Sequence, residues 1–343
     1  MVNSSTSVVK PLMYDGSLIA MGRYAMTNDA LDTIENDDSA SIIAMGSSMM
    51  FKAFNGSCFD ENDGVDDANY YNLAIPNSRP YNDMVHIPKI IQSKPEIVIL
   101  EVGVMSLDNP GESRMEYIEF RYKLDTMLQN NEDVGEWINL LEDDFGAWIA
   151  TNDFERMEFM QDWFPDASEE ILSRVILNES GVYPFSTYPQ VPKVGSAEWL
   201  HFLQEPEWPP IRFDAMPPEV AQQYNETEMP NSAAFYRPNS DGTLSHLALQ
   251  YMVEELVNAD IQVVLTTLPH HPLVYQYLEP GQWDPLNDTL APYTNMNNVH
   301  IIDNTWAQGW KHEHFDDRNH LDGDGREEFC LRTSQLLSSI EGD

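Results

Sequence analysis

The stretch Ser41-Ile42-Ile43-Ala44-Met45-Gly46-Ser47-Ser48 decides how this chain of 343 residues folds. Residues 41–46 form a short apolar run, which is typical of a strand buried on both faces of a parallel sheet. Gly46 permits a tight bend after the strand, and Ser47 to Phe54 predicts a turn into a helix. The inner face of that helix consists of Met49, Met50, Phe51 and Phe54. We therefore expect a strand that delivers serines to a helix N-terminus.

Strands and amphipathic helices alternate along the rest of the chain. Strands are predicted at 70–75, 95–104, 261–268 and 299–303. Helices are predicted at 17–26, 82–93, 242–259 and 325–340, and Pro88 should kink or shorten the second of them. This alternation is typical of a parallel sheet with helices packed on it. We expect an α/β fold with three α/β/α layers and a mostly parallel sheet.

An acidic, tryptophan-rich segment interrupts this alternation at residues 110–239. It shows helical periodicity at 114–128, 134–149 and 167–177, and a proline-rich stretch at 183–218 without any strand pattern. The segment is too long for an ordinary loop, so we expect a helical insertion that could act as a lid. The α/β domain is then divided between 41–109 and 240–343, after an N-terminal extension over 1–40.

The tryptophans of this insertion have two interpretations. Aromatic faces stack on sugar rings, which would indicate a carbohydrate-binding surface, whereas packing inside a lid would make the same side chains core residues. The residues concerned are Trp137, Trp148, Trp163, Trp199 and Trp208.

The formal net charge of -39 comes from 57 acidic and 18 basic residues. This balance argues against a nucleic acid or an anionic membrane as partner, because phosphate binding needs clustered Lys and Arg. The acidic residues are spread along the chain, so we interpret them as a heavily solvated surface of the kind adapted to high salt. Attraction of a cationic substrate is the alternative.

The sequence leaves the cellular compartment open between the cytoplasm and the cell exterior or surface. No run reaches the roughly 18 apolar residues that span a bilayer, and residues 1–10 lack the apolar core of a signal peptide. Cys58 and Cys330 lie too far apart in sequence to indicate a disulfide framework. They either form one bridge or remain two free thiols.

Histidines and carboxylates gather at residues 312–317, with His320 close behind. These are zinc-ligand types, but their spacing matches no known site, and the Asp-rich run 316–324 lacks the spacing of an EF-hand. We therefore predict no metal site there.

Two short segments at opposite ends of the chain supply the parts of an acyl-transfer site. Gly46-Ser47-Ser48 follows the first strand, where parallel sheets place functional groups, and Asp317-Arg318-Asn319-His320-Leu321 lies in the last thirty residues. Serine is a poor nucleophile unless a base takes its proton, and the base works best when a carboxylate orients it. An Asp three residues before a His can do this from one loop. Ser47 is the competing serine, for which we expect helix capping.

These segments resemble sequence blocks of the SGNH (GDSL-like) hydrolase superfamily, over residues 41–107 and 243–340. Gly46-Ser47-Ser48 looks like the family's Gly-Asp-Ser block, which makes Ser48 the nucleophile. Asp317-Arg318-Asn319-His320-Leu321, followed by Gly325, looks like the last block. This implies that His320 is the general base and Asp317 its orienting carboxylate, with Asp316 as the adjacent alternative.

The two middle blocks of the resemblance are altered. Asn77 stands at the glycine whose backbone N–H serves the oxyanion hole. Met105 stands where the third block, Gly-x-Asn, has its asparagine, and losing such a donor typically costs about 2.7–4 kcal/mol of transition-state stabilisation. Asn109, Ser106 or Arg79 could replace it. The resemblance leaves the oxyanion to backbone N–H groups of Ser48, Asn77 and Gly103.

The resemblance implies an SGNH/flavodoxin-like fold and a serine-dependent esterase or O-acyltransferase without a cofactor. Its partner would be a small acyl ester or an acylated carbohydrate, with Arg79, Met105 and His270 as candidate substrate-binding residues. The blocks and the long insertion look closest to the branch of DltD-like O-acyltransferases. A non-catalytic SGNH-like domain that binds a glycan or a partner protein is the alternative, and the oligomeric state stays open.

Overall fold

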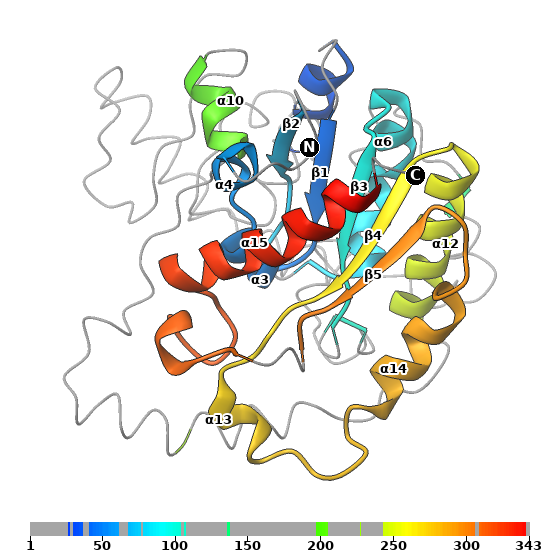
Figure 1. Ribbon diagram of the computed structural model, residues 1–343. Helices are drawn as coiled ribbons and strands as arrows, with labels where there is room; N and C mark the ends of the chain where they lie inside the picture. The colour runs from blue at the N-terminus through cyan, green and yellow to red at the C-terminus, as the bar shows by residue number, and fades with distance from the viewer. Residues whose placement is uncertain are drawn as a thin grey trace, which may run out of the picture.

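A five-stranded sheet forms the centre of the computed structural model, which describes residues 27, 30–36, 41–61, 68–76, 78–103, 106–107, 136–137, 197–204, 227, 243–305 and 309–340. Its strands are β1 (Ser41–Met45), β2 (Asn69–Asn72), β3 (Ile97–Glu101), β4 (Gln262–Thr267) and β5 (Val299–Asp303). They are ordered β2-β1-β3-β4-β5, and every neighbouring pair runs parallel (Figure 1). The predicted α/β fold with a parallel sheet is confirmed.

This strand order creates a switch point between β1 and β3. From β1 the chain continues to β2 on one side, and then crosses over to β3 on the other side. Open α/β sheets bind ligands outside the carboxyl ends of the strands at such a point. Met45 pairs with Leu100 in the register of these two strands, so Gly46 follows directly beside Glu101.

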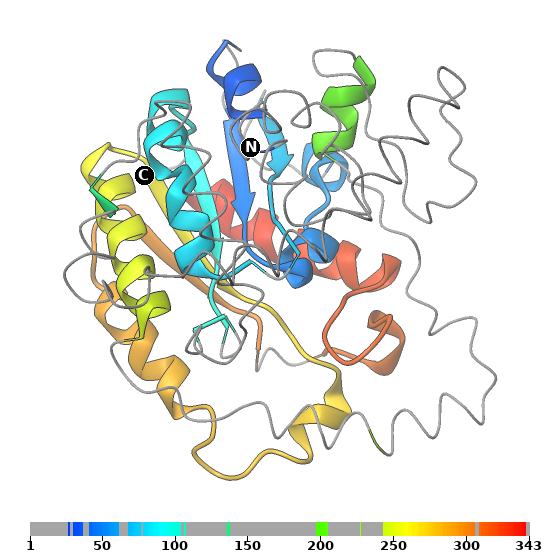
Figure 2. The same cartoon turned by 180° about the vertical axis from the view of Figure 1, so that it is seen from behind.

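Helices cover both faces of the sheet and enclose two apolar cores. Ile42, Ala44 and Ile99 pack on one face with α3 (Ser48–Ala53), α4 (Gly56–Glu61) and α15 (Gly323–Ile340). Ile43 and Val98 pack on the other face with α5 (Pro80–Asp83), η3 (Met84–His86), α6 (Ile87–Ser93), α12 (Leu244–Asn258) and α14 (Asp284–Leu290). Figure 1 shows the side of α3 and α15, and Figure 2 the side of α6 and α12.

The helix predicted at 82–93 is divided into α5, η3 and α6, because Pro88 falls in the first turn of α6. Three elements that the sequence analysis did not predict also carry a proline in their first turn: α13 (Pro272–Tyr275), α14 and η5 (Ala291–Tyr293). Proline fits there because it lacks only an N–H that a first turn leaves unpaired. In the part of the chain that the structure describes, no helix is long and apolar enough to cross a membrane.

The other predicted elements match the structure within a few residues, where they can be compared. β2 ends at Asn72 rather than at 75, although the N–H groups of Leu73 and Ile75 still donate to Ala44 and Gly46 at 2.9 and 2.8 Å. The helices predicted at 17–26, 114–128 and 167–177 lie outside the described residues, and of the helix predicted at 134–149 only residues 136–137 are described.

The insertion is described only at residues 136–137, at α10 (Ala197–Gln204) and at 227. Trp137 is fully buried in the core that also contains Leu203 and the inner face of α12. For this tryptophan the structure therefore supports packing rather than an exposed sugar-binding face. Trp148, Trp163 and Trp208 lie outside the described residues, as does the Trp199 side chain, and the domain boundaries stay predictions.

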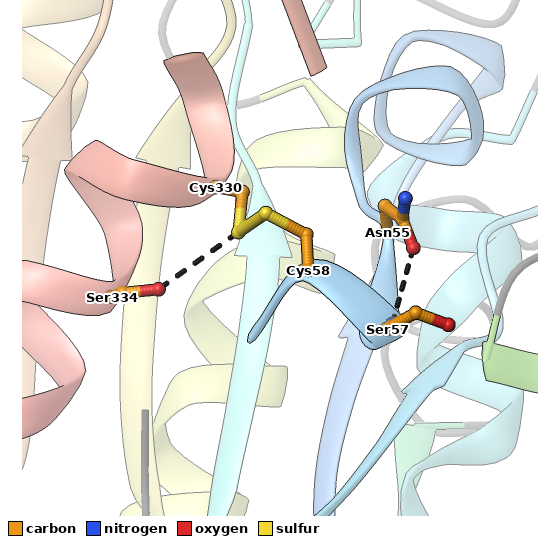
Figure 3. The surroundings of a disulfide bond; sticks show 5 residues. All are labelled: Asn55, Ser57, Cys58, Cys330 and Ser334. Atoms are coloured by element: carbon orange, nitrogen blue, oxygen red, sulfur yellow. Dashed lines mark hydrogen bonds between the residues drawn. A yellow bond between two sulfur atoms is a disulfide. The ribbon is translucent and has the colours of Figure 1, made fainter. Parts of the chain in front are cut away.

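The two cysteines form a disulfide between α4 and α15 (Figure 3). The Cα atoms of Cys58 and Cys330 lie 6.3 Å apart, although 272 positions separate the two residues in the sequence. The structure thus decides between the bridge and the two free thiols that the sequence left open. The bond fastens the first α/β segment to the last helix.

We expect reduction of this disulfide to lower the free energy of unfolding by about 2–4 kcal/mol, because the bridge restricts the unfolded chain. Urea unfolding with and without a reductant measures the difference. A Cys58→Ser/Cys330→Ser variant is the control and should not respond to the reductant. Alkylation of two thiols in the unreduced, unfolded protein would contradict the bridge.

Candidate active site

Ser48, His320 and Asp317 form a chain of hydrogen bonds beside the carboxyl edge of the sheet. Ser48 Oγ lies 2.9 Å from His320 Nε2, and His320 Nδ1 lies 2.7 Å from Asp317 Oδ2. The Ser48–His320 contact joins residues 272 positions apart. The structure thus brings together the three residues that the sequence analysis selected, and we refer to them as the Ser–His–Asp triplet.

The hydrogen bonds fix the imidazole tautomer. An ionised carboxylate only accepts hydrogen bonds, so His320 Nδ1 carries the proton that is donated to Asp317. His320 Nε2 is then left with a lone pair toward the Ser48 hydroxyl. This is the arrangement in which an imidazole can take a proton from a serine.

Ser48 is the first residue of α3, and Ser47 caps this helix. The Ser47 Oγ accepts the N–H of Met49 at 3.2 Å. The capping role expected for Ser47 is therefore confirmed. The side chains of Met49, Met50 and Phe51 anchor the helix in the apolar core, which fixes the position of Ser48 relative to β1.

The Glu101 carboxylate holds the turn that contains Ser47 and Ser48. It accepts the Ser47 N–H at 2.7 Å, the Ser47 hydroxyl at 2.8 Å and the Met50 N–H at 3.3 Å. Burial raises the pKa of Glu101, and the hydrogen bonds from Ser47 and Met50 offset only part of that effect. The sequence analysis missed this role. An acidic residue at the end of an apolar strand was the signal that could have revealed it.

Gly46 makes room for this carboxylate. Its φ is +150°, and a Cβ atom at this position would lie only 2.5 Å from both Cβ and Oε2 of Glu101. No L-residue with a side chain fits that space without moving β1 or β3. The glycine is thus required by a close approach and by a backbone conformation that other residues rarely adopt.

The backbone donors expected for an oxyanion hole differ in their availability. No acceptor for the Ser48 N–H is found among the described residues, whereas the N–H groups of Ser47 and Met50 donate to Glu101. The Gly103 N–H donates to Ser106 Oγ at 2.9 Å, so an oxyanion would have to displace this hydroxyl. Asn77 and Met105 lie outside the described residues, as does Asn109.

The loop that carries His320 is folded around Asp317. Asp317 Oδ1 accepts the N–H groups of Asn319 and His320, each at 2.9 Å. Burial raises the pKa of Asp317, but the hydrogen bonds from His320 and from these N–H groups outweigh it, and the pKa is lowered overall. Asp317 is therefore ionised at neutral pH. Asp316, the alternative orienting residue, bonds instead to Lys52.

His270 lies buried just after β4, close to the Ser–His–Asp triplet. Burial, together with the positive charge of Arg318 and with His320, lowers the pKa of His270 to about 3, so it is neutral at physiological pH. Its ring packs edge-on against Tyr275 and Trp283. The substrate-binding role expected for His270 stays a prediction. The same holds for Arg79, which is half-buried and precedes α5.

The neighbouring histidines bond within the protein. His271 caps α13 by accepting the Leu273 N–H at 3.2 Å, and its Nε2 is hydrogen-bonded to His312 Nδ1. Within the described ranges, no group of three or more His, Cys, Asp or Glu side chains is placed to hold a metal ion. The His271 N–H also donates to the Arg318 carbonyl at 2.8 Å, which ties this loop to the loop of Asp317.

No family model matches this chain, and no curated protein matches its sequence. The grounds for a functional interpretation are therefore the geometry of the site and the resemblance of its sequence blocks.

We expect Gly46→Ala to destabilise the fold and to displace Ser48. Overpacking against Glu101 costs about 1–3 kcal/mol, and the strained backbone adds a cost of the same order. Gly323→Ala is the matched control, because nothing lies within 4 Å of a Cβ at that position. Thermal unfolding of both variants tests this. Equal stability of Gly46→Ala and the unmodified protein would contradict the close approach.

We expect Asp317→Asn to lower the free energy of unfolding by about 1–3 kcal/mol at pH 7, and by less at pH 3. The folded-state pKa of Asp317 is lowered from 3.8, so its carboxylate stabilises the protein above that pH. This contribution disappears as the pH falls through the lowered folded-state pKa. Urea unfolding at both pH values measures it. Glu327→Gln, at an exposed position of α15, is the control that should show no such pH dependence.

Proposed function

We propose that this protein is a serine-dependent esterase or O-acyltransferase of the SGNH type that acts on a small acyl ester, including one carried by a glycan. The hydrogen-bond chain from Ser48 through His320 to Asp317 supports this most directly. Its members come from the end of β1 and from a late loop, as the resemblance implies. The site also lies at the switch point of the sheet, where α/β folds bind ligands.

The reaction begins when Ser48 Oγ attacks the carbonyl carbon of the ester. His320 Nε2 takes the serine proton, and Asp317 stabilises the imidazolium that forms. The tetrahedral intermediate then collapses, His320 gives the proton to the departing alkoxide, and an alcohol leaves an acylated Ser48. Water, or a sugar or polyol hydroxyl, next loses a proton to His320 and attacks the acyl group. This second step releases a carboxylic acid or a new ester and restores the Ser48 hydroxyl.

The developing oxyanion needs donors that are not already engaged. The Ser48 N–H meets this requirement, because no acceptor for it is found among the described residues, whereas Glu101 and the Ser47 hydroxyl accept the neighbouring N–H groups of the turn. Asn77 is the second expected donor. The Gly103 N–H contributes only if Ser106 turns away from it. This incomplete set predicts a slower enzyme than one with a side-chain amide in the hole.

A non-catalytic domain that binds a glycan or a protein is the second candidate. The observation in its favour is Met105, which stands where the resemblance expects an asparagine. The hydrogen bond from the Gly103 N–H to Ser106 also favours this candidate, because it occupies a donor that the oxyanion hole would need. Such a protein would keep the Ser–His–Asp triplet without turning over esters.

Hydrolysis of p-nitrophenyl acetate and labelling of Ser48 by a fluorophosphonate test the proposal. We expect Ser48→Ala to abolish labelling and to reduce kcat by at least about 10³-fold, because the nucleophile is lost. Ser339→Ala, at an exposed position near the end of α15, should keep both. Full activity in Ser48→Ala would exclude this mechanism.

Two further measurements separate the candidates. Formation of an acylated polyol when glycerol is present in excess would indicate a transferase rather than a hydrolase. No turnover of small esters or acylated glycans, combined with retained glycan or protein binding, would favour the non-catalytic domain.

A further inference from the structure

Two adjacent aspartates of the late loop have separate partners. Asp317 bonds to His320, whereas Asp316 Oδ2 lies 2.6 Å from Lys52 Nζ. The side chains of Lys52 and Asp316 are each only 10% exposed. This buried ion pair lies next to the Ser–His–Asp triplet but is not part of it.

The ion pair joins the same two segments as the Ser48–His320 hydrogen bond. Lys52 lies four residues after Ser48 on α3, which places both side chains on one face of the helix. Asp316 directly precedes Asp317 on the other segment. Two links one helical turn apart fix the distance between the segments and also their relative rotation, which a single hydrogen bond leaves free.

Asp316 is connected to His320 through the backbone as well. The Asp316 N–H donates to the His320 carbonyl at 2.9 Å, and Phe315 pairs with Leu321 in an antiparallel bridge that closes the loop. Phe315 and Leu321 are buried in the same core as Met49 and Phe51 of α3. A shift of Asp316 relative to α3 is therefore passed on to His320.

The free energy of unfolding does not by itself explain why a buried ion pair stands at this place. Removing two charges from water is costly, and replacing a buried ion pair by apolar residues of similar size is often neutral or stabilising. Breaking the pair by removing one partner is different, because it leaves one charge buried and uncompensated. The defined geometry of the pair is thus the property that an apolar contact would not reproduce.

We propose that Lys52 and Asp316 are positioning residues, which hold the loop of residues 316–320 against α3 so that His320 Nε2 meets Ser48 Oγ. This inference rests on the proposed function, since it assigns these residues to the same site. Neither residue contacts a reacting atom.

The test replaces the ion pair by an apolar pair, Lys52→Met/Asp316→Leu. We expect the free energy of unfolding to stay equal or to increase, and KM to change little. In contrast, kcat and the rate of fluorophosphonate labelling should fall on the order of 10²-fold, because a misplacement of about 1 Å has this effect. Lys52→Arg, which keeps a charged donor, should retain most of kcat.

Lys89→Met/Asp32→Leu is the matched control. This pair also joins two segments, at 2.8 Å, but its side chains are 29% and 57% exposed. It should leave kcat unchanged. Unchanged kcat in Lys52→Met/Asp316→Leu would overturn the positioning role, and so would a loss of kcat that only follows a loss of stability.

Amide hydrogen exchange provides a readout that does not depend on catalysis. The N–H groups of Asn319 and His320 are bonded to Asp317, so their protection reports whether the loop keeps its place. We expect lower protection in Lys52→Met/Asp316→Leu at unchanged global stability, and unchanged protection would overturn the inference. If the unmodified protein neither turns over esters nor labels at Ser48, the proposed function fails, while this exchange measurement still decides the role of the ion pair.

Discussion

The carboxyl ends of β1 and β3 meet at Gly46 and Glu101, and the geometry of the whole site depends on how closely they approach. A single additional carbon at Gly46 would lie 2.5 Å from the Glu101 side chain. The absence of that carbon lets the carboxylate reach three donors of the turn after β1. The turn is thereby fixed in the orientation that starts α3 at Ser48. A buried carboxylate with three donors is also far less costly than one without partners.

Three links connect the segment after β1 to the end of the chain. They are the Ser48–His320 hydrogen bond, the Lys52–Asp316 ion pair and the Cys58–Cys330 disulfide. On the early side they follow one another along α3 and α4, and on the late side they lie in the loop of Asp317 and in α15. Each link closes a chain of more than 250 residues, so their combined effect is to make the relative position of the two segments well defined.

The site contains three buried carboxylates, and each has its own set of donors. Glu101 is bonded by the turn after β1, Asp316 by Lys52, and Asp317 by His320 and two backbone N–H groups. The balance between burial and hydrogen bonding differs between Glu101 and Asp317, so the pKa of Glu101 is raised whereas that of Asp317 is lowered. In a chain with a net charge of -39, local burial and hydrogen bonding rather than overall composition therefore set the pKa of Glu101 and of Asp317.

Local patterns in the sequence were sufficient to predict the strands, the glycine bend, the capping by Ser47 and the interruption at Pro88. Each of these features depends on residues that lie close together in the sequence. The pairing of Asp317 with His320 was predictable for the same reason. The disulfide, the partner of Asp316 and the role of Glu101 were decided only by the tertiary structure. They join the turn after β1, α3 and α4 to the end of β3, to the loop of Asp317 and to α15, and no local periodicity records contacts between such distant parts of the chain.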